Sequence, residues 1–442
     1  MPLTALAMYS IYAVLFIGGF WRPILGVLGY LVIYFVYSPY AWWVVSAGLF
    51  FPRPSLIAAL LLIVGAFLNA RKFNWSISRR EVEFYLFLSA CWLSTAVFGV
   101  VLEADNWEYL MKMTKIFIMI FFFIRVVDSL ENFKLVIWAF IFSGLFMSYQ
   151  AHMLTVVGRI DSIGGIDFGE ANGLSAFLSI VVIFAAFQFL NASWVKKIFY
   201  VMGIALMCDT IILAQSRAVL LGVAAAVPYV FFRAPPKKLK QIFVYMILGI
   251  IMFINLADQN FISRMSTIGE RIESASSFNI IDEDEVVDRL DFWRTSIPIF
   301  RDHPMGIGIK NFWKIVPLYD PRNSGMDVHN TYILCYSEIG VIGIILFLII
   351  IAETFLQMNR IWRMAQGTAH EAEILPLVTA LGASLIVYLC GYMMTHSILY
   401  TEFLWILLTM PICLENAARK ILAQEFIPVV DEAPGPVAQT AY

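Results

Sequence analysis

Apolar segments long enough to cross a membrane recur along most of this 442-residue chain, and they constrain its fold more than any other feature. A membrane-spanning helix needs about 20 mostly apolar residues. Segments of this kind lie at 54–70, 84–102, 110–127, 133–151, 173–190, 198–215, 217–232, 241–256, 330–352, 374–395 and 398–416. The first 51 residues allow one long span, two short spans, or two spans followed by a re-entrant piece at 41–51. We therefore predict about 12 membrane-spanning helices.

The composition is typical of a polytopic membrane protein. Hydrophobic residues make up 61% of the chain and charged residues 14%, whereas soluble proteins average about 45–50% apolar and about 25% charged residues. The formal net charge of −2 gives no indication of a nucleic-acid partner. The five cysteines lie in or beside apolar segments and form no C-x-x-C pair, so we interpret them as small apolar side chains. We expect an all-α membrane helix bundle that forms a single transmembrane domain over residues 1–442.

The placement of lysine and arginine indicates the orientation of the helices, because basic loops stay in the cytoplasm. The basic loops contain Arg71-Lys72 and Arg79-Arg80, Lys196-Lys197, Arg233 with Lys237-Lys238 and Lys240, and Arg360 with Arg363. The alternate loops then face outward, including the large loop at 257–328. The Pro- and Ala-rich tail at 428–442 is predicted to be cytoplasmic and disordered.

The large loop contains a helical pattern of its own. Apolar residues recur at Leu290, Trp293, Ile297 and Phe300, which is the spacing of one helix face. We therefore expect an amphipathic helix on the membrane surface. One proline and two glycines within 302–308 are expected to end this helix.

A histidine stands where the large loop meets the next apolar segment. His329 and Asn330 directly precede a membrane span. Histidine has an ordinary pKa of about 6.5, so a neutral imidazole can accept a proton near pH 7, and His329 is a candidate general base. Asn330 and Tyr332 are candidates to hydrogen-bond sugar hydroxyls or to orient the ring. The alternative is that His329 only marks the membrane interface.

Three outward-facing arginines are candidates for binding phosphate. Arg217 lies between two apolar segments, Arg289 begins the expected surface helix, and Arg159 lies in a Gly-rich loop. Arginine binds phosphate oxygens in a bidentate manner, so converging arginines would suit a lipid-linked pyrophosphate. The alternative is that Arg217 anchors its helix at the interface or pairs with Asp209, while the other two are ordinary surface residues.

Acidic residues and known motifs give fewer indications. Glu338 lies nine positions after His329, on the opposite helix face, so we expect it to pair with a neighbouring helix or to cap a loop. We interpret the run Asp282-Glu-Asp-Glu285 as a solvated loop. The sequence contains no H-E-x-x-H, G-x-S-x-G or P-loop motif, so we expect neither a metal nor a cofactor.

Several short stretches between residues 159 and 352 occur in a characteristic order. They are Ala214-Gln-Ser-Arg-Ala218; Arg289-Leu-Asp-Phe-Trp293 with Asp302-His-Pro-Met-Gly-Ile-Gly308 and Asn311-Phe312; and His329-Asn330 with Glu338-Ile-Gly340 and Gly343. A looser match runs from Arg159 to Asn172-Gly173-Leu174. Together these stretches resemble the O-antigen ligase and O-antigen polymerase superfamily of bacterial membrane glycosyltransferases. Ala218 departs from the pattern, because glycine is common there in the family.

The resemblance implies a GT-C-like, metal-independent, inverting enzyme. It would move a glycan from undecaprenyl pyrophosphate to an acceptor hydroxyl on the periplasmic face of the bacterial inner membrane. Carried over by position, Arg217 and Arg289 would hold the pyrophosphate and His329 would activate the acceptor. The residues assigned to substrate binding are Arg159, Asn330, Tyr332, Asn311 and His303. The acidic run near Arg289 could compete for its guanidinium.

The resemblance leaves the acceptor open. A lipid A core acceptor would make the chain an O-antigen ligase of lipopolysaccharide biosynthesis, and a second lipid-linked repeat would make it an O-antigen or exopolysaccharide polymerase. The first 70 residues, with Arg22-Pro23, Ser38-Pro39 and Trp42-Trp43, resemble exopolysaccharide-linked members, which keeps the polymerase close behind the ligase. A protein O-oligosaccharyltransferase is the third possibility. A transporter is the non-enzymatic alternative, and it would place charge at the bilayer midplane, where Glu353 and Glu402 are the best candidates.

Overall fold

A computed structural model describes residues 2–48, 53–154, 160, 163–257, 259, 261–263, 286–323, 328–394 and 396–425. For residues 286–292, 323 and 425 it describes the backbone only. Helices, turns and connecting segments make up this part of the chain, and it holds no β-strand. The predicted all-α class is therefore confirmed.

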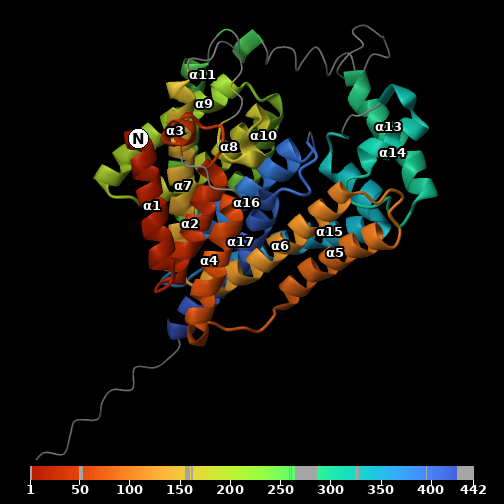
Figure 1. Ribbon diagram of the computed structural model, residues 1–442. Coiled ribbons are helices and arrows are strands. Elements are labelled where there is room, and N and C mark those ends of the chain that lie inside the picture. Colours follow the sequence, from red (N-terminus) through yellow and green to blue (C-terminus); the bar gives the residue numbers. More distant parts are fainter. Residues whose placement is uncertain are drawn as a thin grey trace, which may run out of the picture.

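The helices pack as one bundle (Figure 1). The first nine are α1 (Leu3–Gly19), α2 (Pro23–Val36), α3 (Trp42–Ala47), α4 (Pro54–Leu68), α5 (Arg79–Ala96), α6 (Ala104–Val126), α7 (Leu130–Met153), α8 (Ala171–Phe189) and α9 (Trp194–Ala214). They are followed by α10 (Arg217–Arg233), α11 (Leu239–Leu256), α13 (Val286–Asp302), α14 (Phe312–Tyr319), α15 (Thr331–Ala365), α16 (Glu371–Ile386), the π-helical η5 (Val387–Tyr392) and α17 (Glu402–Glu425).

Six helical segments in the described part of the chain are long and apolar enough to cross a membrane. They are Leu130–Met153, Ala171–Phe189, Trp194–Ala214, Pro236–Leu256, Thr331–Ala365 and Glu371–Tyr392. The helices α1, α2 and α4 are apolar but shorter. Each predicted span contains a helix, which confirms a polytopic membrane helix bundle, while the number of about 12 crossings stays a prediction. In the first 51 residues, two helices followed by the short α3 fit the third of the interpretations given above.

The helix expected in the large loop is present as α13, and it ends at Asp302, before the predicted break. Figure 1 shows α13 and α14 together at one side of the bundle, where both helices contact α15. The position of α13 on a membrane surface stays a prediction. The acidic run at 282–285 and the tail at 428–442 lie outside the described residues.

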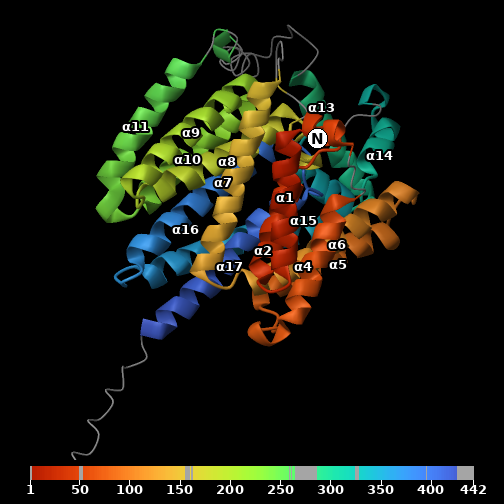
Figure 2. The same cartoon turned by 60° about the vertical axis from the view of Figure 1, so that its left-hand side comes forward.

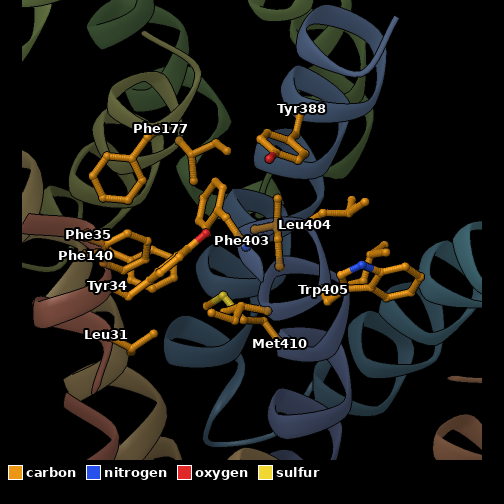
Figure 3. Close-up of a cluster of buried hydrophobic side chains, with 14 of the residues drawn as sticks. Leu31, Tyr34, Phe35, Phe140, Phe177, Tyr388, Phe403, Leu404, Trp405 and Met410 are labelled. Atoms are coloured by element: carbon orange, nitrogen blue, oxygen red, sulfur yellow. Dashed lines mark hydrogen bonds between the residues drawn. The ribbon is translucent and has the colours of Figure 1, made fainter. Parts of the chain in front are cut away.

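Aromatic side chains join the central helices. Phe35 of α2, Phe140 of α7, Phe177 of α8 and Phe403 of α17 form one cluster (Figure 3), and its ring centroids lie 4.5–6.2 Å apart. Within a bilayer the lipid is as apolar as these rings, so close van der Waals packing holds the helices together. The cluster ties α17 to the three helices on one of its sides.

On its other side, α17 is fixed by Trp405. Its ring lies 4.9 Å from that of Phe87 in α5, 4.8 Å from that of Phe117 in α6 and 6.0 Å from that of Phe347 in α15. Figure 3 shows Trp405 pointing away from Phe403. Helix α17 therefore connects two groups of helices, whereas α11 lies at an edge of the bundle beside α9 (Figure 2) and has no buried residue.

Buried ion pairs hold one end of the bundle, which we call the arginine end after Arg80 and Arg125. Ser78 and Glu81 form a capping box at the start of α5. The same Glu81 forms an ion pair with Arg125, near the last turn of α6, and both side chains are almost fully buried. Arg125 also donates to the carbonyl of Ser76 at 2.8 Å. These contacts fasten the start of α5 to the end of α6.

The second arginine of this end fastens α5 to α15. The basic-loop pattern predicts a cytoplasmic loop position for Arg80, but the structure places it in the first turn of α5, where it is 6% exposed. Arg80 forms an ion pair with Glu83 and donates to the carbonyl of Ile350 at 3.1 Å and to the hydroxyl of Thr354 at 2.9 Å. The opposite end of the bundle, which we call the histidine end, contains His329.

Candidate functional site

Two of the family-like stretches meet at a break in α15. Gly340 has φ 80° and ψ −168° inside this helix, so its hydrogen-bond ladder is interrupted. The segment 304–312, which follows α13, docks there through the N–H of Ile307, which donates to the carbonyl of Ser337 at 3.0 Å. The stretch after α13 and the stretch around Gly340 are therefore one structural unit.

The carboxylate of Glu338 stabilises this unit. It accepts hydrogen bonds from the backbone N–H groups of Lys310 and Phe312, each at 2.9 Å, and a short one from the hydroxyl of Tyr400. Glu338 is 1% exposed. The expectation that Glu338 caps a loop is confirmed, because two loop N–H groups donate to it.

Glycine is required where the backbone of the segment 304–312 crosses the backbone of α15. A Cβ atom on Gly340 would lie 2.3 Å from the carbonyl carbon of Met305, and one on Gly306 would lie 2.5 Å from the carbonyl oxygen of Glu338. Both glycines also have positive φ values, 80° and 91°, which side chains disfavour. This explains two of the glycines in the stretches that carry the family resemblance.

Asn311, predicted to bind substrate, has a positioning role in the structure. Its side chain is fully buried. The amide nitrogen donates to the carbonyls of Val101 and Ile307 at 2.8 and 2.6 Å, and the amide oxygen accepts from Asn106 at 2.9 Å. Asn311 thus holds the segment 304–312 against the start of α6.

Asn330 and Tyr332 shape the start of α15. The side-chain oxygen of Asn330 accepts hydrogen bonds from the backbone N–H groups of Tyr332 and Ile333 at 3.0 and 3.1 Å, which makes it the N-cap. The hydroxyl of Tyr332 donates to the carbonyl of Leu389 at 3.2 Å. Both side chains therefore fix the helix that carries the candidate base, and a contact with sugar stays a prediction.

Thr331 ties the same helix end to the segment between η5 and α17. Its backbone N–H donates to the carbonyl of Met393 at 2.9 Å, and its hydroxyl donates to the carbonyl of His396 at 2.6 Å. The N–H of Ile398 in turn donates to the hydroxyl of Thr331 at 3.0 Å. The contacts of Thr331 hold the start of α15 against the segment between η5 and α17. His329 lies beside the first of these segments and His396 lies in the second.

His329 is exposed and has a strained backbone. Its φ of 49° is in the left-handed region, which costs a residue other than glycine about 1–3 kcal/mol. The centroid of its ring lies 6.4 Å from that of His396, and the two rings are nearly perpendicular. Strain of this kind concentrates at functional sites. Here the strained residue places its exposed imidazole beside the buried imidazole of His396.

The second imidazole is held in place. His396 is 9% exposed, and its ring packs 4.5 Å from that of Tyr392. Its Nε2 atom lies 2.9 Å from the amide nitrogen of Asn172 and 4.0 Å from a carboxylate oxygen of Glu170. The amide of Asn172 and the carboxylate of Glu170 therefore both face the same ring nitrogen.

The contact with Asn172 brings a further family-like stretch into the site. Asn172 lies in the first turn of α8, and a Cβ atom on the adjacent Gly173 would lie 2.8 Å from the hydroxyl oxygen of Tyr392. A larger residue at 173 would displace the hydroxyl of Tyr392, whose ring packs against His396. The pair Asn172-Gly173 therefore positions the buried histidine.

Arg217 begins α10 and is partly exposed. The next residue, Ala218, lies against η5, because a Cβ atom on Gly391 would be 2.8 Å from the Ala218 carbonyl oxygen. The close approach therefore requires glycine at position 391, and it does not depend on the side chain at position 218. Since η5 leads into the segment that carries His396, the first turn of α10 packs close to the histidine end of the bundle.

The remaining candidates are placed less completely. Arg289 lies in α13, but its side chain is outside the described structure, as is the whole of Arg159. His303 follows α13 directly, and its N–H donates to the carbonyl of Ile299 at 2.9 Å. Asp209, the alternative partner of Arg217, has a carboxylate oxygen 2.6 Å from Nε2 of His152.

Sequence reasoning missed His396. It stands in a short connection between two apolar segments, which is the same kind of position that singled out His329. A search for every ionisable residue at the edge of a span would have found it, but the contact with His329 depends on a fold that brings residues 331 and 396 together. In the described part of the chain no three or more His, Cys, Asp or Glu side chains gather as metal ligands would.

Residues 202–348 match the sequence model of a family described as O-antigen ligase. This match confirms the resemblance to the O-antigen ligase superfamily. The matched segment contains Arg217, Arg289 and His329, whereas Asn172 and His396 lie outside it. A search of curated proteins finds no matching relative. The superfamily supports a membrane glycosyltransferase of the O-antigen ligase or polymerase type, with lipid-linked glycan and acceptor substrates.

Proposed function

We propose that the chain transfers a glycan from an undecaprenyl-pyrophosphate carrier to an acceptor hydroxyl on the periplasmic face of the bacterial inner membrane, as an O-antigen ligase does. The observation that carries the proposal is His329. It is exposed, strained, within the matched segment, and beside a second histidine at the start of a membrane helix. The basic loops support the orientation, because they lie at the opposite ends of the helices.

His329 acts as the general base in this proposal. It takes the proton of the acceptor hydroxyl while the hydroxyl oxygen attacks the anomeric carbon of the donor. The new glycosidic bond forms as the bond between the anomeric carbon and the pyrophosphate oxygen breaks, and the pyrophosphate leaves with its lipid. Attack from the side opposite the leaving group inverts the anomeric centre. The proton then passes from His329 to solvent.

The arginines stabilise the leaving group. Negative charge grows on the pyrophosphate as the bond breaks, and fixed positive charges beside it lower the barrier. Arg217 and Arg289 are assigned to this role, with Arg159 as a third. Arg217 is supported by its place at the N-terminus of α10, where the helix dipole also favours an anion. No metal is needed for this chemistry.

The acceptor is best identified with purified protein in detergent. An undecaprenyl-pyrophosphate glycan is offered together with lipid A core in one reaction and with a second lipid-linked repeat in another. Product on the core identifies the ligase that we propose, and a ladder of repeats identifies a polymerase. Consumption of donor without either product indicates a protein acceptor. Failure to consume the donor contradicts a transferase.

A further inference from the structure

A cavity of about 950 Å³ lies at the histidine end of the bundle and is not used by the chemistry proposed above. Its volume is within the range of about 300–1,000 Å³ that small-molecule sites occupy. The ends of α2, α4, α6 and α17 surround it, together with the segment 164–169. These elements are not the ones that carry Arg217 and Arg289.

Two helices face the cavity with different chemistry. Tyr30 and Tyr34 lie one turn apart near the end of α2, and Tyr37 follows the helix directly. Across from them α6 contributes Lys112 and Lys115, which are separated by one turn. Residues at such spacings share a helix face, so one wall offers aromatic rings and the other offers cationic donors.

The carboxylate of Glu402 is the most informative group in the cavity lining. Glu402 begins α17 and is 7% exposed, and among the described residues its Oε1 atom has no hydrogen-bond partner. A buried acceptor without a donor is costly. A rotation of the side chain toward the cavity would let a ligand hydroxyl supply that donor.

The charges of the lining indicate a polyhydroxylated ligand rather than a pyrophosphate. The basic residues of the lining are Arg53, Lys112 and Lys115, and the acidic residues are Glu108, Asp167 and Glu402. Glu108 and Asp167 offset two of the three positive charges, and burial disfavours the charged form of Glu402, so a free anion gains little there. Sugar hydroxyls both donate and accept, which suits carboxylates, ammonium groups and tyrosines together.

One short turn connects the cavity to the histidines. Gly169 lines the cavity, while the next residue, Glu170, lies 4.0 Å from His396. Asp167 lines the cavity as well, and it accepts a hydrogen bond from Tyr34 at 2.6 Å. The segment that lines the cavity therefore also approaches His396, which lies beside the candidate base.

We propose that this cavity binds the acceptor saccharide and directs its hydroxyl toward His329. The assignment rests on the proposed transfer function. Helix α10, which begins at Arg217, packs against η5, and η5 leads to His396. The cavity instead lies beside the segment 164–169, which leads to Glu170 and its contact with His396. Donor pyrophosphate and acceptor sugar would therefore approach the histidines along different elements.

The test uses Lys115→Gln and Glu402→Gln in the full-length protein. Lys115 is exposed, so its replacement leaves the packing intact, and Glu402→Gln keeps the size of the side chain. The controls are Lys237→Gln and Glu131→Gln, which make the same chemical changes at exposed positions away from the cavity. In the transfer assay each cavity variant should raise the KM for the acceptor about tenfold and leave the KM for the donor unchanged. The controls should change neither. A higher donor KM with an unchanged acceptor KM would overturn the assignment.

A binding measurement separates this inference from the proposed function. The probes are core oligosaccharide and repeat oligosaccharide freed from lipid by mild acid, titrated into His329→Asn protein, which is expected to bind without turnover. The double cavity variant should weaken binding of one probe about tenfold relative to the double control. If that loss occurs while the wild type transfers nothing, the saccharide site stands and the transferase fails. Equal affinity in both proteins, or no binding of either probe, overturns the site.

Discussion

The two ends of the bundle hold their ionisable side chains in opposite ways. At the arginine end, Arg125 and Glu81 are buried against each other, with side chains 1% and 3% exposed. At the histidine end, His329 is exposed on a strained backbone, and the buried Glu402 has a carboxylate oxygen without a partner among the described residues. The ends lie about 30 Å apart along α15. Charges that satisfy one another hold the architecture of the arginine end, and we propose that the open groups of the histidine end serve the substrates.

The largest expected effect on stability is at the arginine end. Arg125→Ala leaves the buried carboxylate of Glu81 without its cation, so we expect the free energy of unfolding to fall by about 3–5 kcal/mol. Unfolding of the purified protein by titration with SDS measures this loss. The control is Arg419→Ala, which removes a pair with Glu415 whose arginine is 59% exposed, and it should cost about 0–1 kcal/mol. Similar losses in the two variants would contradict the claim that burial makes the pair of Arg125 and Glu81 strongly stabilising.

Arg217→Ala should affect activity and leave stability nearly unchanged. We expect turnover to fall at least about tenfold, because the leaving pyrophosphate loses a fixed positive charge. Arg217→Lys should restore only part of the rate, since an ammonium group cannot bind two oxygens in the bidentate manner of a guanidinium. Full activity in the lysine variant would indicate a simple charge or a membrane anchor.

His396 and Asn172 should act as a pair. His396→Ala is expected to slow transfer about tenfold by loosening the surroundings of His329. Asn172→Ala should cause a similar loss, and the double variant should be little worse than either, because residues in direct contact are not independent. Thermal unfolding of each variant checks that the fold is kept. If the two losses multiply in the double variant, the two residues act independently and the pairing is contradicted.

Removal of divalent metal should have no effect. The proposed chemistry relies on a histidine and arginines, so the rate of transfer should be the same with and without EDTA. Loss of activity that returns on addition of Mg²⁺ or Mn²⁺ would contradict the assignment of the leaving-group role to arginine.

The positions of the helices could largely be predicted from the sequence, whereas the buried ion pairs of the arginine end could not. Apolar length alone locates helices such as α7 and α15, because a bilayer imposes it. Arg80 reads as part of a basic loop in the sequence, and its contact with Ile350 depends on how α5 packs against α15. Long-range partners of a charged residue are set by packing that local pattern does not reveal.

The site was predictable in part. His329 and Asn330 were found because polar residues at the start of a membrane span stand out. Asn311 belongs to the same group of family-like stretches, yet it is buried and holds a loop. A motif does not distinguish a residue that touches substrate from one that supports the site. His396 was missed because only the contacts of Thr331 bring it near His329.

The central claim is that the histidine end performs glycan transfer with His329 as the base. The most direct test compares wild-type protein with His329→Asn in single-turnover transfer from an undecaprenyl-pyrophosphate glycan. Asparagine tolerates the left-handed backbone at this position, so the fold should be kept, and SDS unfolding verifies it. The account predicts that the rate falls by about 10²–10⁴-fold while unfolding is unchanged. A His329→Asn protein that transfers at the wild-type rate would contradict it.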